Sequence, residues 1–357
     1  MKKWIISVLC VTLCCLLLVG SINFFVDPLM YYRSLHPALS FVAFDYDYIN
    51  PGLAKNSDYT AVLVGTSLTE NTDMDYCEGL FHQKMVKLIY PGGTAKNNHT
   101  ILDVAFRTHC VNRVLWTIDD SLFFSAADEL SHELPTYLYD TNKLNDISYL
   151  LNFSILYNYS FKSALGSLRG MKNTPLLRGD VWGADEQYGY DQVMAKTSFS
   201  PADAKPVDFY QENITGNLNA HIIPIITEHP QTQFDFYFPP KCIVYWGAAE
   251  SNGVLDAKFF SMNEIVKTLL AYPNVRIYFY MDKMDWTDFD LYRDSIHFNQ
   301  EINNRIMDEI AASHGELTFD NYARVLENCH RLYKEMDYSQ IIHQTVDKGA
   351  RAHTECK

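Results

Sequence analysis

The chain has 357 residues, 48% of them hydrophobic, and its 29 basic and 43 acidic residues leave a formal net charge of −14. This length is enough to bury a sizeable core and suits one large α/β domain, or one domain with a long insertion. The acidic surplus argues against nucleic acid as a partner, because nucleic-acid-binding surfaces carry basic stripes. It also means that any attachment to anionic lipids has to be hydrophobic.

Residues 1–26 are predicted to be a transmembrane signal anchor. No charged residue occurs between Lys3 and Asp27, and this stretch is long enough to cross a bilayer core of about 30 Å. The basic start favours a cytoplasmic N-terminus. We therefore expect a single-pass protein of the cell membrane whose remaining residues are extracytoplasmic. A cleaved signal peptide is the alternative, but Val19-Gly-Ser21 is a weak cleavage site.

Residues 27–58 are predicted to form an irregular juxtamembrane stalk that packs back on the domain. The segment is rich in aromatic residues, and Pro28, Pro37 and Pro51 interrupt it. The globular part is expected to span residues 59–357.

From Tyr59 onward, short apolar runs alternate with turns and helical patterns, which predicts an α/β fold with a parallel sheet and helices on both faces. A long insertion is expected between strands 3 and 4, at about residues 121–240, as a cap or substrate-facing subdomain. The tail at 322–357 carries helical fragments. The predicted strands are residues 60–64, 84–90, 113–118, 242–246 and 275–280, and the predicted helices are residues 100–110, 258–272 and 298–312.

The eight cysteines do not predict a metal site. Three of them, Cys10, Cys14 and Cys15, lie in the apolar N-terminal stretch. The other five include no C-x-x-C pair, so no zinc site is indicated. One or two disulfides are compatible with the sequence, but their pairing is open.

Several polar residues follow predicted strands, where the active sites of open parallel sheets lie. Ser67 comes after the first strand in a turn that begins at Gly65, and Asp294-Ser-Ile-His297 follows the fifth. This set supplies a nucleophile (Ser67), a general base (His297) and a carboxylate that orients the base (Asp294). The alternatives are that Ser67 starts a helix in a capping box with Glu70, and that the other two are ordinary loop residues.

Donors for a tetrahedral oxyanion are expected from the backbone N–H groups of Ser67 and of Gly92 or Gly93, because glycine allows close approach of the backbone. The glycine pair also fits a simple tight turn. Asp119 and Asp120, after the third strand, are either part of the same edge or N-caps of the next element.

The order G-x-S, glycine turn and D-x-x-H resembles the SGNH/GDSL hydrolases. The anchor and the insertion resemble the membrane-attached branch of that superfamily, which includes O-acetyltransferase-like proteins and D-alanyl-lipoteichoic acid biosynthesis proteins. The resemblance covers residues 59–122 and 241–312. It implies a flavodoxin-like, SGNH-type sheet, with Ser67 as nucleophile, Gly93 or Gly92 as oxyanion donor, and Asp294 and His297 completing the triad.

The chain departs from that pattern in two places. The usual G-D-S is Gly65-Thr66-Ser67, and Thr117-Ile-Asp-Asp120 stands where G-x-N-D would supply an asparagine. An ionised carboxylate cannot donate a hydrogen bond. Asn97 or Asn98 could serve as the donor instead, although both also fit a loop surface.

The sequence thus predicts a membrane-anchored serine esterase or O-acyltransferase, without metal or cofactor, that acts on a cell-surface glycan. Its expected partners are the membrane, a glycan or acyl-donor substrate and a membrane acyl-transfer protein. The alternative is a non-enzymatic scaffold or binding partner in envelope polymer assembly. A phosphate-processing enzyme ranks third, because the chain has no Walker loop and no carboxylate cluster with metal spacing.

Overall fold

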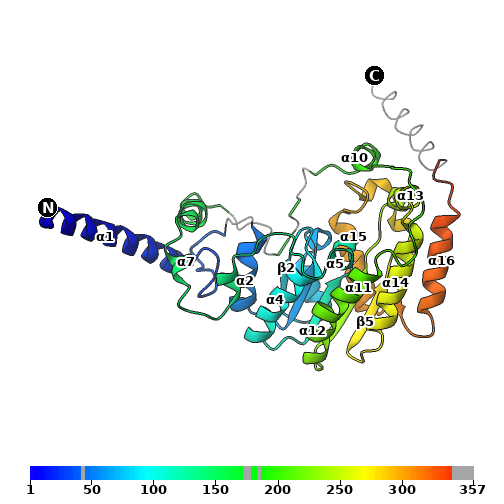
Figure 1. The fold of residues 1–357 in the computed structure, drawn as a ribbon, viewed down its shortest axis with the longest axis horizontal. Coiled ribbons are helices and arrows are strands. Elements are labelled where there is room, and N and C mark those ends of the chain that lie inside the picture. The colour runs from blue at the N-terminus through cyan, green and yellow to red at the C-terminus, as the bar shows by residue number, and fades with distance from the viewer. Residues whose placement is uncertain (42–44, 172–177, 180, 183–185, 340–357) are drawn as a thin grey trace, which may run out of the picture.

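The computed structural model describes residues 1–41, 45–171, 178–179, 181–182 and 186–339. Its first element, α1 (Lys2–Val26), is the predicted apolar helix and extends away from the body of the protein (Figure 1). Among the described helices, α1 is the one long and apolar enough to cross a membrane, a property that it shares with signal sequences.

The body is built on a six-stranded, mostly parallel sheet in the order β2-β1-β3-β4-β5-β6. Only β6, at one edge, runs antiparallel to its neighbour. Strand order reverses between β1 and β3, which creates a switch point at the carboxyl ends of these strands. The strands are β1 (Ala61–Gly65), β2 (Met85–Ile89), β3 (Arg113–Thr117), β4 (Gln233–Phe238), β5 (Val275–Phe279) and β6 (Glu316–Leu317).

The predicted fourth strand at 242–246 is wrong. That run belongs to helix α13 (Ile243–Ser251), and the strand lies earlier, in β4. The β4 pattern is interrupted by Asp235, which is fully buried and pairs with Arg113 at 2.9 Å. A short apolar run such as 242–246 fits a buried helix as well as a strand.

Helices cover both faces of the sheet (Figure 1). On one face α3 (Met74–Phe81) packs against α15 (Gln300–Ala311). The other face carries α4 (Ala95–Thr108), α12 (Ile223–Glu228) and α14 (Leu255–Leu269), with α16 (Tyr322–Lys334) packed on α14. This arrangement follows from right-handed crossovers between parallel strands. The predicted helical fragments beyond residue 339 lie outside the described residues.

Residues 46–56 differ from the predicted irregular stalk, because they form helix α2 (Tyr46–Asn56), which packs on α4 and β2. Pro51 lies inside this helix, although proline was expected to interrupt the chain. Proline cannot donate to the carbonyl four residues earlier. That carbonyl, on Asp47, accepts a hydrogen bond from the Tyr139 hydroxyl at 2.7 Å instead.

The segment between β3 and β4 is long, as predicted, but it ends at β4 rather than near residue 240. Its last part, α11 (Gln211–Asn217) through α12, forms the crossover that leads into β4. The remaining helices of the segment are α5 (Asp120–Phe124), α6 (Thr136–Tyr139), α7 (Ile147–Leu150), α8 (Phe153–Ile155), η2 (Leu156–Phe161), α9 (Lys162–Leu168) and α10 (Tyr190–Lys196).

The described cysteines form no disulfide. Cys77, Cys242 and Cys329 are buried singly in the core, whereas Cys110 and the three cysteines of α1 are exposed. Cys356 lies outside the described residues.

Candidate active site

Ser67 begins a single 3-10 turn, η1 (Ser67–Thr69), directly beyond the carboxyl end of β1. Gly65 lets the end of β1 approach β3 closely, since a Cβ there would lie 3.0 Å from the Thr117 side chain. The Thr69 N–H and hydroxyl both donate to the Thr66 carbonyl, at 3.0 Å and 2.7 Å, which closes the turn. The N-cap of this turn is Thr66, so Ser67 does not serve as a capping residue here.

Asp294 and His297 share a tight loop between β5 and α15. Asp294 Oδ1 accepts hydrogen bonds from the N–H groups of Ile296 (2.9 Å) and His297 (2.8 Å), which folds the loop around the carboxylate. The Arg293 N–H donates to the His297 carbonyl at 3.0 Å. The D-x-x-H spacing therefore lets the backbone N–H groups of the loop itself orient the Asp294 carboxylate.

The structure brings Ser67, His297 and Asp294 together, although 230 residues separate the first two. Ser67 Oγ lies 2.7 Å from His297 Nε2, and His297 Nδ1 lies 2.7 Å from Asp294 Oδ2. The side chains of His297 and Asp294 are 18% and 16% exposed, so the pair is shielded but reachable. In this arrangement the imidazole can accept the serine proton while the carboxylate holds the ring and its tautomer.

Electrostatics keep the Asp294 carboxylate ionised. Burial by itself raises the pKa of this carboxyl group. The hydrogen bond and electrostatic attraction of His297, together with the N–H groups of Ile296 and His297, outweigh burial and lower the pKa of Asp294 to about 2. A carboxylate that stays ionised can stabilise the imidazolium that forms when the base takes a proton.

The predicted glycine donors belong to a turn at the start of α4. The Gly93 N–H donates to the Tyr90 carbonyl at 2.7 Å, and Gly92 has a φ of 65° and is exposed. The turn between β2 and α4 thus places Gly92 at a positive φ, a backbone conformation that glycine permits. Because the Gly93 N–H is engaged in this turn, it is not a free donor in the present conformation.

Asn97 and Asn98 are buried in the first turn of α4, not on a loop surface. Asn97 Oδ1 accepts from the Thr94 N–H at 3.1 Å and completes a capping box with that residue. It also accepts from the Ser131 N–H at 3.0 Å. Within the described residues, the Ser67 N–H has no hydrogen-bond acceptor, so it remains available to an oxyanion.

Asp119 and Lys241 form an ion pair beneath the Ser67 turn that sequence reasoning did not predict. Lys241 Nζ lies 3.0 Å from Asp119 Oδ1, and the Thr66 hydroxyl donates to Asp119 Oδ2 at 3.0 Å. Asp119 is also the N-cap of α5, which is one of the two roles predicted for it. Burial raises the pKa of this carboxyl group, but the Lys241 ammonium and the accepted hydrogen bonds overcome that effect and hold the pKa below its ordinary value.

Sequence reasoning missed Lys241 because of the misplaced fourth strand. With a strand at 242–246, Lys241 would lie at the amino end of the sheet. In the structure it follows β4 and lies at the carboxyl edge, on the same side as Ser67. The sequence feature that could have located Lys241 is its position directly after Pro239-Pro240, because proline cannot donate to the ladder of a central strand.

Trp182, in the long segment between β3 and β4, contacts the His297 imidazole edge to face at 5.5 Å between ring centroids. Its indole N–H donates to Glu70 Oε2 at 2.8 Å, and the Arg293 guanidinium lies 4.2 Å from its ring. Arg293 in turn pairs with Glu186 at 3.1 Å. Part of the segment predicted to face the substrate therefore adjoins the site.

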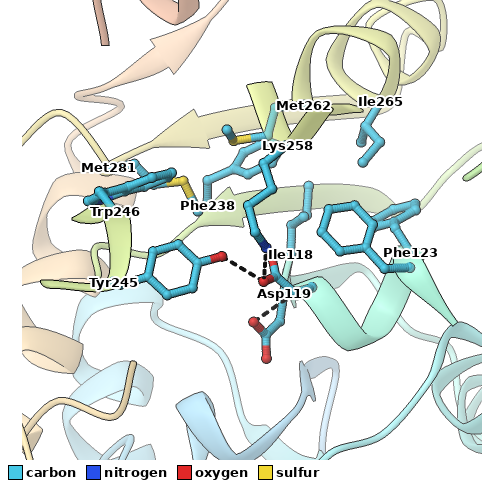
Figure 2. Close-up of a pocket in the computed structure, with 12 residues that line it drawn as sticks. Ile118, Asp119, Phe123, Phe238, Tyr245, Trp246, Lys258, Met262, Ile265 and Met281 are labelled. Carbon is cyan, nitrogen blue, oxygen red and sulfur yellow. Dashed lines mark hydrogen bonds and ion pairs between the residues drawn. The ribbon is translucent and has the colours of Figure 1, made fainter. Parts of the chain in front are cut away.

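A small cavity lies beside Asp119, at the carboxyl ends of β3, β4 and β5 (Figure 2). Its polar corner is Asp120, which accepts hydrogen bonds from Lys258 and from the Tyr245 hydroxyl. The cavity has a volume of about 20 Å³, room for about one water molecule. It is too small to be the substrate pocket in this conformation.

Among the described residues, no group of three His, Cys, Asp or Glu side chains could hold a metal ion. No family model matches the chain, and no curated protein matches it. Among solved structures, the chain is similar to one provisionally described as a platelet activating factor from Streptococcus pneumonia. That likeness has 12% identity and a TM-score of 0.40, over 74% of this chain and 91% of the other. A match this distant supports no statement about function.

Proposed function

We propose that this protein is a membrane-anchored, extracytoplasmic serine esterase or O-acyltransferase of the SGNH type that acts on acyl esters of a cell-surface glycan. The observation that carries the proposal is the contact of 2.7 Å between Ser67 Oγ and His297 Nε2, at the carboxyl edge of a parallel sheet. The flavodoxin-like strand order and the resemblance of the three motifs to SGNH hydrolases support it. The anchor helix supports the location.

In the proposed reaction, Ser67 Oγ attacks the acyl carbonyl carbon while His297 Nε2 takes the hydroxyl proton. The Ser67 N–H stabilises the oxyanion of the tetrahedral intermediate. Collapse of the intermediate breaks the ester C–O bond, and His297 returns the proton to the leaving alcohol. Water in hydrolysis, or a glycan hydroxyl in transfer, then attacks the acyl-enzyme while His297 takes the proton of the acceptor. The bond between the acyl carbon and Ser67 Oγ breaks, and His297 returns the proton to Ser67 Oγ.

The test uses the full-length protein in vesicles. Ser67→Ala should abolish covalent labelling by a fluorophosphonate probe and lower acetyl-ester turnover about 10³-fold or more. Ser198→Ala, which removes an exposed serine hydroxyl, is the control and should leave both readouts unchanged. If Ser67→Ala retains full turnover and labelling, Ser67 is not the nucleophile.

The second candidate is a non-enzymatic scaffold or binding partner in envelope polymer assembly, and one observation favours it. One of the predicted oxyanion donors, the Gly93 N–H, is engaged in the turn before α4, whereas Asn97 is held in the cap of α4 only through Oδ1 and its Nδ2 has no hydrogen-bond partner among the described residues. A folded wild-type protein that fails to react with the fluorophosphonate probe would select this function over the esterase.

A further inference from the structure

The segment from Leu144 to Met171 is attached to the body-proximal end of α1 (Figure 1). Asn23, the one buried residue of α1, donates to the carbonyls of Leu150 at 2.9 Å and Asn152 at 3.1 Å. The Ser160 hydroxyl donates back to Asn23 Oδ1 at 2.8 Å. The segment is therefore held beside the helix that is predicted to cross the membrane.

The continuous helix α8–η2–α9 exposes more large apolar and aromatic side chains than a surface helix in water does. Its buried side carries Ile155 and three small residues, Ser160, Ser163 and Gly166. A helix on an aqueous surface places its large apolar residues against the core. Here four large side chains point outward, with exposed fractions of 69% for Phe153, 59% for Tyr157, 57% for Phe161 and 86% for Leu168.

Three of these side chains form a regular row. The Phe153 and Tyr157 rings, and the Tyr157 and Phe161 rings, have centroids 6.5 Å apart and nearly parallel planes. Such a row of exposed aromatic rings is a continuous apolar surface, and surfaces of this kind mark contacts with a protein or a membrane.

The segment that carries this row contacts α1 through α7 and η2, which favours the membrane over a protein as its partner. An open, largely apolar groove of about 620 Å³ lies between α1 and α7, with Lys143 and Asp146 also among the residues that line it. One wall includes Leu13 and Leu17 of the spanning helix, and the other includes Leu144 and Ile147, which are 89% and 58% exposed. Lipid that surrounds α1 reaches this groove, and η2, which carries part of the aromatic row, contacts α1 directly.

Depth and charge agree with a position at the membrane surface. The 25 residues of α1 give a length of about 37 Å at 1.5 Å per residue, against a hydrocarbon core of about 30 Å. Asn23, near the end of α1, then lies close to the outer boundary of that core. Lys143 precedes the segment, and Lys162 and Arg169 lie within it. Aromatic and basic side chains are typical of membrane interfaces.

We propose that residues 144–171 form a second membrane contact, an interfacial helix whose row Phe153, Tyr157, Phe161 and Leu168 inserts into the outer leaflet beside α1. The spanning helix and the interfacial helix together attach the body at two places. They fix its height above the bilayer and its rotation about α1, which a single helix does not. This inference does not depend on the catalytic proposal.

The experiment measures the depth of spin labels in the full-length protein. The four exposed cysteines and Cys356 are first replaced by serine. A nitroxide is then attached at Tyr157→Cys or Phe161→Cys, and the protein is reconstituted into phosphatidylcholine and phosphatidylglycerol vesicles that contain no other protein. Phe319→Cys is the matched control, because Phe319 is equally exposed (61%) but follows β6, far from α1 along the sheet.

Inserted labels should collide with oxygen, which is concentrated in lipid, more often than with a water-soluble nickel complex. We expect this ratio at positions 157 and 161 to be about tenfold higher than at position 319. Equal ratios at all three positions would overturn the proposal, and a surface reserved for a protein partner would give that same result in these vesicles. Leu168→Cys gives an independent reading if one labelled variant misfolds.

Discussion

Lys241 Nζ lies 3.0 Å from Asp119 Oδ1, and the lysine side chain is fully buried. The pair connects the ends of β3 and β4, and through the Thr66 hydroxyl it supports the turn that carries Ser67. A buried ion pair contributes little net stability compared with apolar side chains, but removal of one partner leaves an uncompensated charge.

Lys241→Met should therefore lower the free energy of unfolding by about 3–5 kcal/mol. Lys258→Met is the matched control. Its partner Asp120 is 40% exposed, so water can solvate the remaining carboxylate and the loss should stay below about 1 kcal/mol. Denaturant titration of the full chain in detergent measures both. Equal losses in the two variants would contradict the role of burial.

Asp294 should make stability depend on pH in the acid range. Its folded-state pKa of about 2 lies below the value of about 4 in unfolded chains. The stabilisation is therefore present above pH 4 and is lost as pH falls towards 2. The unfolding free energy of the wild type relative to Asp294→Asn should be about 1 kcal/mol smaller at pH 3 than at pH 5. A difference that is constant over this range would show that Asp294 is not ion-paired in the folded protein.

The same Asp294→Asn variant should also lower acetyl-ester turnover by about 10³–10⁴-fold, because the neutral amide favours the wrong imidazole tautomer and cannot stabilise the imidazolium. The variant should fold like the wild type, and circular dichroism checks this. Turnover within tenfold of the wild type would mean that the carboxylate does not act through His297.

The two glycines after β2 should respond differently to alanine. A Cβ on Gly93 would lie 2.6 Å from Tyr90 Cβ and 2.8 Å from its carbonyl oxygen, so Gly93→Ala has to displace backbone and should cost more than about 2 kcal/mol. Gly92→Ala has open space, but its φ of 65° is unfavourable for alanine by about 1 kcal/mol. Thermal unfolding of both variants checks the order, and a larger loss for Gly92→Ala would contradict it.

Asn23 should couple α1 to the body. Asn23→Leu leaves the carbonyls of Leu150 and Asn152 and the Ser160 hydroxyl without this partner, and should cost about 2 kcal/mol. Ser21→Leu introduces the same side chain at an exposed position of α1 and should be nearly neutral. Thermal unfolding in detergent compares the two variants. Equal unfolding temperatures would show that Asn23 does not couple α1 to the body.

Local pattern alone was sufficient to predict α1, four of the parallel strands and the position of Ser67 at a strand end. It did not locate β4, because the buried Asp235 breaks the apolar run, and the more apolar stretch after Pro240 forms a helix. Helix α2 was also missed, since Pro51 was taken to exclude a helix. The Asp47 carbonyl, which loses its helical hydrogen bond, accepts one from the Tyr139 hydroxyl, 92 residues further along the chain.

The amino-acid sequence by itself determined which chemical groups this protein has and at which strand ends they occur, because periodicity and turn residues act over a few positions. Only the tertiary structure decided which groups meet. The 2.7 Å contact between Ser67 and His297, the Lys241–Asp119 pair and the packing of Trp182 on the imidazole all join segments separated by more than a hundred residues. Such contacts depend on sheet order and on packing between layers, which no local pattern encodes. The outward-facing aromatic row of α8–η2–α9 is of the same kind, because its exposure is set by how the helix packs on α1 and the body.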